Sequence, residues 1–190
     1  MLLVSQNIGN YEINIPKDTV FRINMAWCNS ISELKEKLEK NINSSFFIDL
    51  PIGRIKPPNN RYTLDEMIPI LNKNENVKFF AVSNVESGDD LKEFLEKIPN
   101  RINIVPKIES PNAVLNIDEI CNSLRSENRF VMLDHDDLFS SIIRNNEDTE
   151  NFQNYIKKLI KYCEENNISL LRTVGVLFSD DEKRTTQYQK

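Results

Sequence analysis

The sequence predicts an α/β protein built on a parallel β-sheet. From about residue 19, short apolar runs rich in Val, Ile, Leu and Phe alternate with stretches whose apolar residues recur at three- and four-residue spacings. The apolar runs are nearly continuous, which is typical of strands covered on both faces. This order of elements favours a single domain over residues 1–190, in which helices cover a parallel sheet of βα units.

Six segments have the composition of buried strands: 20–27, 45–50, 77–83, 102–108, 129–134 and 169–177. The stretches between them carry one apolar stripe each, as amphipathic helices do. Two helix starts show capping-box patterns, in which a hydroxyl and a carboxylate three residues apart satisfy the first backbone amides: Ser30 with Glu33, and Thr63 with Glu66.

The two ends of the chain differ from this pattern. Tyr11, Ile13 and Ile15 alternate weakly with polar residues, so residues 1–18 are expected to form an N-terminal extension or an edge strand, while residues 180–190 form a polar tail. About six βα strands in 190 residues fall short of the roughly 250 residues of a closed eight-stranded barrel. We therefore expect an incomplete barrel, or one completed by the N-terminal segment or by a partner chain, and hence a homo-oligomer or other assembly.

Composition narrows the classes of partner. The chain has 24 basic and 29 acidic residues, a formal charge of −5, and no basic run that would attract nucleic acid or an anionic membrane surface. It has no signal-peptide pattern and only strand-length apolar runs, which predicts a soluble cytoplasmic protein. Cys28, Cys121 and Cys163 are widely spaced, so they are expected to be buried thiols.

Charged residues gather at two predicted strand ends. Lys107 and Glu109 lie two positions apart and so point to the same side, and the cluster Asp134–Asp137 ends the next strand. Parallel strands are roughly 4.8 Å apart, so Glu109 and Asp137 could share one cation. Carboxylate oxygens with open positions suit Mg²⁺ or Mn²⁺. The same residues also fit an interpretation without a metal. Asp134–Asp137 would then be a solvated loop, and Glu109 with Ser110 and Pro111 would begin the next helix.

Several segments resemble the pyruvate kinase family. IVPKIE at 104–109, followed by NIDEI at 116–120, is similar to that family's I-x-K-I-E … F-D-E-I, and Asp137-Leu138 matches its G-D-L. Residues 22–24 resemble A-R-L-N-F-S, 49–56 resemble D-x-x-G-P-K-I-R, 82–90 resemble A-S-F-V … D-V, and 163–179 resemble C-N-x-x-G-K-P-V-I-x-A-T-Q-M-L-E-S. The similarity runs from about residue 20 to 180.

The resemblance implies a barrel of pyruvate-kinase type that binds phosphoenolpyruvate or pyruvate. It implies catalytic roles for Lys107 and Arg22, Lys107 stabilising an enolate and the phosphoryl group in transfer, and Mg²⁺ or Mn²⁺ held by Glu109 and Asp137. The further implied contacts are Asn24 and Asp49 for K⁺, and Ser83, Asp136 and Thr173 for the substrate.

The chain also departs from the family. Only residues 57–61 stand where pyruvate kinases insert the lid that closes over the nucleotide, and nothing resembles their C-terminal regulatory domain. Val174 falls on the threonine of A-T-Q, with Thr173 beside it. Three interpretations therefore stay open: a kinase-like transferase, a metal-dependent aldolase or lyase of the same superfamily, and an inactive barrel fragment that serves as a binding or assembly module.

Overall fold

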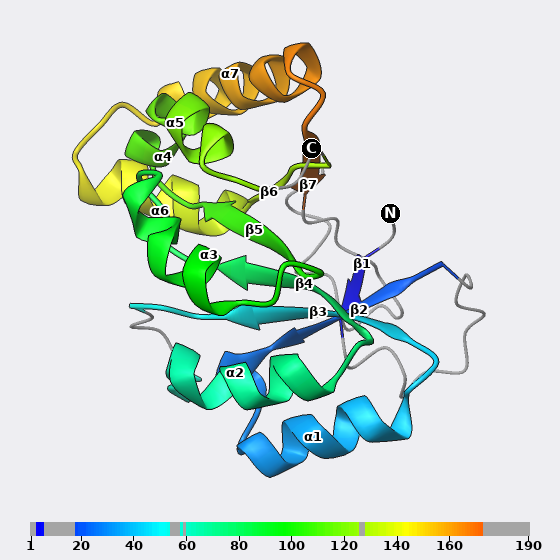
Figure 1. Cartoon of the computed structure of the whole chain (residues 1–190). Coiled ribbons are helices and arrows are strands. Elements are labelled where there is room, and N and C mark those ends of the chain that lie inside the picture. Colours follow the sequence, from blue (N-terminus) through cyan, green and yellow to red (C-terminus); the bar gives the residue numbers. More distant parts are fainter. Residues whose placement is uncertain (1–2, 6–17, 54–57, 59, 126–127, 173–190) are drawn as a thin grey trace.

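The protein is an α/β structure with one parallel, curled sheet. A computed structural model describes residues 3–5, 18–53, 58, 60–125 and 128–172. Among these residues the sheet has seven strands in the order of the sequence, and each strand is parallel to its neighbours (Figure 1). The strands are β1 (Leu3–Ser5), β2 (Val20–Asn24), β3 (Ser45–Leu50), β4 (Val77–Val82), β5 (Asn103–Ile108), β6 (Phe130–Leu133) and β7 (Ser169–Arg172).

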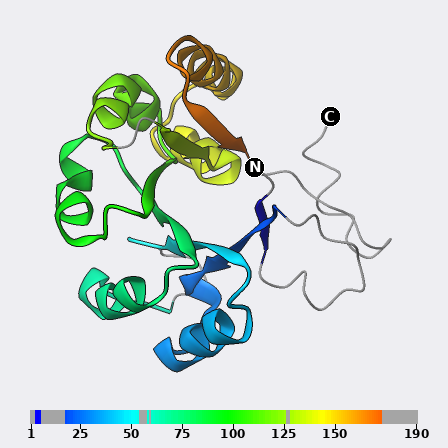
Figure 2. The same cartoon turned by 45° about the vertical axis from the view of Figure 1, so that its right-hand side comes forward.

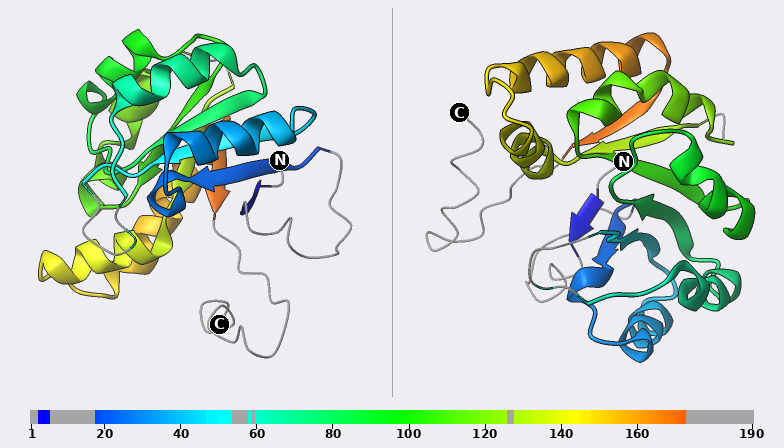
Figure 3. Two further views of the ribbon diagram at one scale, coloured as in Figure 1. Left: turned by 90° about the horizontal axis from the view of Figure 1, so that it is seen from below. Right: turned by 90° about the vertical axis from the view of Figure 1, so that its left-hand side faces the viewer.

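The curl gives the sheet the form of a half-barrel, with the helices along its convex side (Figures 2 and 3). The helices are α1 (Ile31–Lys40), α2 (Leu64–Lys73), α3 (Lys92–Lys97), α4 (Pro111–Leu115), α5 (Ile117–Asn122), α6 (His135–Arg144) and α7 (Asn151–Glu165), with short 3₁₀ turns η2 (Met25–Trp27) and η3 (Asp89–Leu91). The α/β class expected from the sequence is thus confirmed, and the half-barrel that the described residues form is consistent with the expected incomplete parallel βα barrel. No helix within the described ranges is both long and apolar enough to cross a membrane.

Most strand boundaries agree with the prediction, with two differences. The strand expected over 20–27 ends at Asn24, because the Asn24 side chain accepts a hydrogen bond from Ala26 N at 2.9 Å and so caps the 3₁₀ turn η2. The strand expected over 169–177 is described only as far as Arg172. Residues 11–15 also lie outside the described part, while the edge position beside β2 is taken by β1, which pairs Leu3 with Val20.

Both predicted helix caps form. Thr63 and Glu66 make a full capping box at the start of α2, with Glu66 Oε2 accepting from Thr63 N at 2.7 Å. Ser30 caps α1 by accepting from Glu33 N, whereas the Glu33 carboxylate reaches Asn29 N, one residue earlier than in the standard box. These caps fix where α1 and α2 leave the strand ends.

Each face of the sheet has its own apolar core. The larger cluster lies between sheet and helices and includes Ile48, Leu50 and all three cysteines, which are buried free thiols as predicted. The smaller cluster lines the concave face: Val20, Phe47, Phe79, Ala81, Val105 and Met132. Because side chains alternate along a strand, the residues two positions after this inner cluster also face inward.

The predicted association of chains, by which a partner would complete the barrel, stays a prediction. A measurement of the mass in solution tests it against the 22.2 kDa of one chain.

Candidate functional site at the carboxyl ends of the strands

The concave face of the sheet changes from apolar to charged toward the carboxyl ends of the strands. Along β5, Val105 is followed at two-residue steps by Lys107 and Glu109, and along β3 Phe47 is followed by Asp49. Lys107, Glu109 and Asp49 are each at most 5% exposed. A charged group is buried only at considerable cost, so these side chains must neutralise one another or a ligand.

Lys107 lies at the centre of the charged group. Its Nζ is 2.5 Å from Glu109 Oε1, 3.5 Å from Asp134 Oδ2 and 3.9 Å from Asp49 Oδ2. The Lys107 Nζ also lies 3.4 Å from the hydroxyl of Ser83, the residue that directly follows β4. Burial disfavours the ammonium, but the carboxylates of Asp49, Glu109 and Asp134 outweigh it and raise the Lys107 pKa to about 12. Three carboxylates within 4 Å thus favour the charged form of Lys107.

Arg22 and Asp49 form a second ion pair beside Lys107. Arg22 Nε donates to Asp49 Oδ2 at 3.1 Å, and Arg22 Nη2 donates to the same oxygen. Asp49 Oδ1 is buried and accepts no hydrogen bond from any described residue. Asn24 stands opposite Asp49 in the register of β2 and β3. The pair Asn24 and Asp49 therefore retains one buried acceptor at the position for which the resemblance implies K⁺, and that role stays a prediction.

Glu109 is held from two sides. Oε1 contacts Lys107, and Oε2 accepts a hydrogen bond of 2.6 Å from the backbone N–H of Asn84. Asn84 has a φ of +55°, a left-handed conformation that asparagine tolerates better than most residues, and its side-chain amide donates to Ile52 O. Burial raises the pKa of Glu109, although Lys107 and the Asn84 N–H work against this effect.

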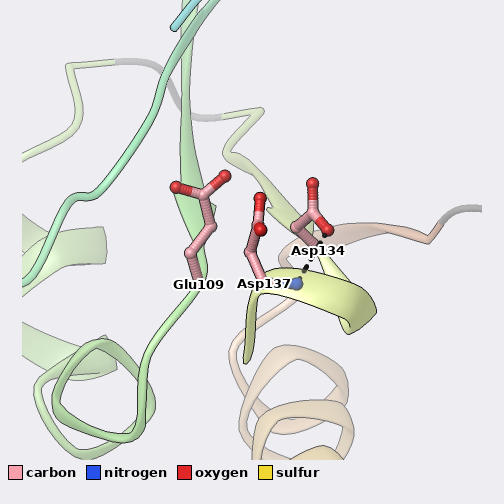
Figure 4. A group of neighbouring side chains, drawn as sticks. All are labelled: Glu109, Asp134 and Asp137. Carbon is pink, nitrogen blue, oxygen red and sulfur yellow. Dashed lines mark hydrogen bonds between the residues drawn. The ribbon is translucent and has the colours of Figure 1, made fainter. Parts of the chain in front are cut away.

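Asp134 and Asp137 lie at the first turn of α6. Asp134 is the N-cap of the helix, and its Oδ1 accepts from Asp137 N at 3.3 Å. The carboxylates of Asp134 and Asp137 lie side by side with that of Glu109 (Figure 4). One oxygen from each of Glu109, Asp134 and Asp137 lies within 4.8 Å of the others. Oxygens around one Mg²⁺ are roughly 3 to 4 Å apart, because each bond is about 2.0–2.1 Å. Small side-chain rotations would therefore bring the three onto one ion.

The balance of charge in this group favours a cation. Among the described residues of this group, four carboxylates lie beside two paired cations, the carboxylates being Asp49, Glu109, Asp134 and Asp137 and the cations Arg22 and Lys107. The cleft above them holds about 60 Å³, and its lining includes Asn24, Ser83, Asn84 and Arg144. A water molecule in the liquid occupies about 30 Å³, so this volume suits an ion with a small ligand.

The structure brings together most of the residues singled out in the sequence. Those that line the cleft or belong to its charged group are Arg22, Asn24, Asp49, Ser83, Lys107, Glu109 and Asp137. Asp136, in contrast, is exposed and does not line the cleft, because it precedes Asp137 by one residue on a helix and so points about 100° away. Thr173 lies outside the described residues.

Three contributors were not assigned roles from the sequence. Asp134 belongs to the predicted acidic cluster but has no predicted role as a third oxygen donor. Its position as the N-cap of α6 is the feature that could have indicated this role. Asn84 supplies a backbone N–H, which no side-chain pattern reveals. Arg144 lines the cleft from α6, seven residues after Asp137, and this two-turn spacing could have been noticed once α6 was recognised as a helix.

Fold and site together define a parallel βα half-barrel with a buried lysine and an acidic group at the carboxyl ends of its strands, where β/α proteins place their sites. No protein-family model matches the chain, and no curated protein does. Among solved structures, RipC from Yersinia pestis is similar, with a TM-score of 0.61 and 13% identity over 98% of this chain and 80% of that one. At this identity the likeness supports the fold alone.

Proposed function

We propose that this protein binds a divalent metal ion, Mg²⁺ or Mn²⁺, together with a small oxyacid of the phosphoenolpyruvate or pyruvate type, and that it promotes enolate chemistry on the oxyacid. The observation that carries the proposal is the group of three carboxylates, Glu109, Asp134 and Asp137, with oxygens within 4.8 Å of one another. Hard oxygen donors and surplus negative charge suit these ions. The site residues match the pyruvate-kinase-like segments of the sequence, and that ancestry is part of the proposal.

The role of the metal would be to neutralise charge and to draw the carboxylate and keto oxygens of the oxyacid into the cleft. Lys107 already holds a permanent positive charge within 3.5 Å of Asp134 and Glu109, so it would face an oxygen of the bound oxyacid. A preorganised cation at the oxygen where negative charge develops is an effective catalytic device. Arg22, which orders Asp49 beside Lys107, would keep this cation in place.

Lyase or aldolase chemistry fits the cleft better than phosphoryl transfer to a nucleotide. The cleft of about 60 Å³ is far smaller than the 300–1,000 Å³ typical of pockets for larger ligands. The nucleotide lid of pyruvate kinases has no counterpart in the sequence. A metal-bound pyruvate-type acid needs neither feature.

Calorimetric titration tests the metal and oxyacid site directly. Titration with Mn²⁺, and then with oxalate as a stable mimic of the enolate, is expected to show binding to the wild type and at least a tenfold loss in Glu109→Gln. Glu36→Gln, which changes an exposed carboxylate on α1, is the matched control and should bind like the wild type. Absence of Mn²⁺-dependent oxalate binding in the wild type would falsify the proposal.

A second measurement separates an enzyme from a binding module. Exchange of the pyruvate methyl protons with solvent deuterium, followed by NMR in the presence of Mg²⁺, is expected for the wild type and not for Lys107→Met. Binding of oxalate without exchange would instead support the module that has lost catalysis.

A further inference from the structure

Arg144 adds a positive charge to the lining of the same cleft. It is the last residue of α6 and lies seven residues, or about 10 Å along the helix axis, beyond Asp137. Seven residues make nearly two full turns, so both residues belong to the same face of α6, and both line the cleft together with Ile52 and Gly53. The first and the last turn of α6 thus each contribute a charged residue to the cleft.

Within the part of the chain that the structure describes, three cations near the cleft differ in what they contact. Lys107 and Arg22 are engaged by the carboxylates of Glu109 and Asp49. Arg144 is exposed, and no carboxylate within the described ranges forms an ion pair with its guanidinium. A cation that lines an acidic cleft and forms no ion pair with its carboxylates can bind an anionic group of a ligand.

The metal-binding residues would hold the carboxylate and keto oxygens of a 2-oxo acid, as proposed above. Ile52 and Gly53 line the same cleft. Gly53 has a φ of +66°, and a Cβ there would lie 3.3 Å from the Asn84 side-chain nitrogen. A larger residue at position 53 would therefore crowd the lining of the cleft.

We propose that Arg144 binds a second carboxylate of the substrate, so that this site takes dicarboxylic 2-oxo acids. The inference rests on the proposed metal and oxyacid site and specifies its substrate class. One guanidinium matches one carboxylate in charge and offers it two parallel hydrogen bonds. A phosphate group, with about two negative charges, would be matched only in part by one arginine.

Matched pairs of acids test the proposal. With Mn²⁺ present, the affinities of oxaloacetate and 2-oxoglutarate are compared with those of 2-oxobutanoate and 2-oxopentanoate, which have a methyl group in place of the second carboxylate. At least one dicarboxylate is expected to bind tenfold or more tightly than its partner in the wild type, which is about what one charge-assisted hydrogen-bonded pair contributes. Arg144→Gln should abolish this ratio, because it weakens binding of the dicarboxylates more than binding of their partners.

The controls make each outcome decisive. Arg125→Gln replaces an exposed arginine that contacts Asn100, outside the cleft, and should keep the wild-type ratio. If oxalate binds but neither dicarboxylate gains over its partner, or if Arg144→Gln keeps the ratio, the role of Arg144 is wrong while the metal site stands. The wild type could instead prefer phosphoenolpyruvate to both dicarboxylates, and Arg144→Gln could lose this preference. That result would also overturn the role of Arg144 as a carboxylate ligand, because Arg144 would then bind a phosphate. Loss of oxalate binding in the wild type would overturn both proposals.

Discussion

At the scale of single residues, the site depends on a lysine that is charged where burial would normally prevent it. Lys107 keeps its proton because three carboxylates surround it, and those carboxylates are tolerated because Lys107 and Arg22 lie among them. Glu109 is the member for which burial outweighs these contacts, and so its pKa is raised. A divalent ion that enters the group would remove the remaining imbalance of charge.

The raised pKa of Glu109 predicts how metal affinity varies with pH. A metal binds the carboxylate and not the acid, so the affinity for Mn²⁺ should rise with pH through the Glu109 pKa, by up to about tenfold per pH unit below it. Without metal the sign is opposite: the folded state holds this proton more tightly than the unfolded chain, so this carboxyl contributes less stability as pH rises. Titrations with Mn²⁺ at a series of acidic to neutral pH values check the first effect, and an affinity that does not rise with pH would contradict it.

At the scale of elements, α6 decides the site, because its first turn supplies two carboxylates and its last turn supplies Arg144. The carboxylate of Asp134 has two roles: Oδ1 caps the helix, and Oδ2 lies 3.5 Å from Lys107. The alternative noted from the sequence, a solvated loop at 134–137, is wrong, since these residues cap and begin a helix. The ambiguity arose because Asp is common both in loops and at helix N-caps.

Two substitutions of Asp134 separate these roles. Asp134→Ser keeps an oxygen that can cap α6 but removes the carboxylate, whereas Asp134→Ala removes both. We expect the alanine variant to unfold with a free energy about 1 kcal/mol lower than the serine variant, and both to lose Mn²⁺ affinity to a similar extent. Denaturant unfolding and Mn²⁺ titration measure the two effects. Equal stability of the two variants would show that the cap contributes little.

At the scale of the whole molecule, the inner apolar cluster supports the charged end of the cleft from below. Phe47 is fully buried on the concave face and stacks on Phe79 of the neighbouring strand at a centroid distance of 6.0 Å. Asp49 follows Phe47 by two residues on the same face. The concave face thus carries aromatic side chains in its middle and charged ones at its carboxyl end.

Removal of the Phe47 ring should therefore destabilise the entire domain. Phe47→Ala is expected to lower the free energy of unfolding by about 3–5 kcal/mol, from lost burial and the cavity left behind. Ile42→Ala, at a side chain that is 71% exposed, should change it by less than about 0.5 kcal/mol. Urea unfolding measures both. A loss below about 1 kcal/mol for Phe47→Ala would mean that the inner cluster contributes little to stability.

The sequence by itself determined the α/β class, the order of strands and helices and the helix caps, because these follow from local periodicity and from hydrogen bonds between residues three or four apart. It also pointed to Lys107, Glu109 and Asp137, since strand ends and two-residue spacing are local features. Only the tertiary structure decided that Asp49 pairs with Arg22, that Asn84 N–H holds Glu109, and that Arg144 faces the same cleft. These contacts join residues far apart in the chain, and they depend on the register and curl of the sheet, which no local pattern specifies.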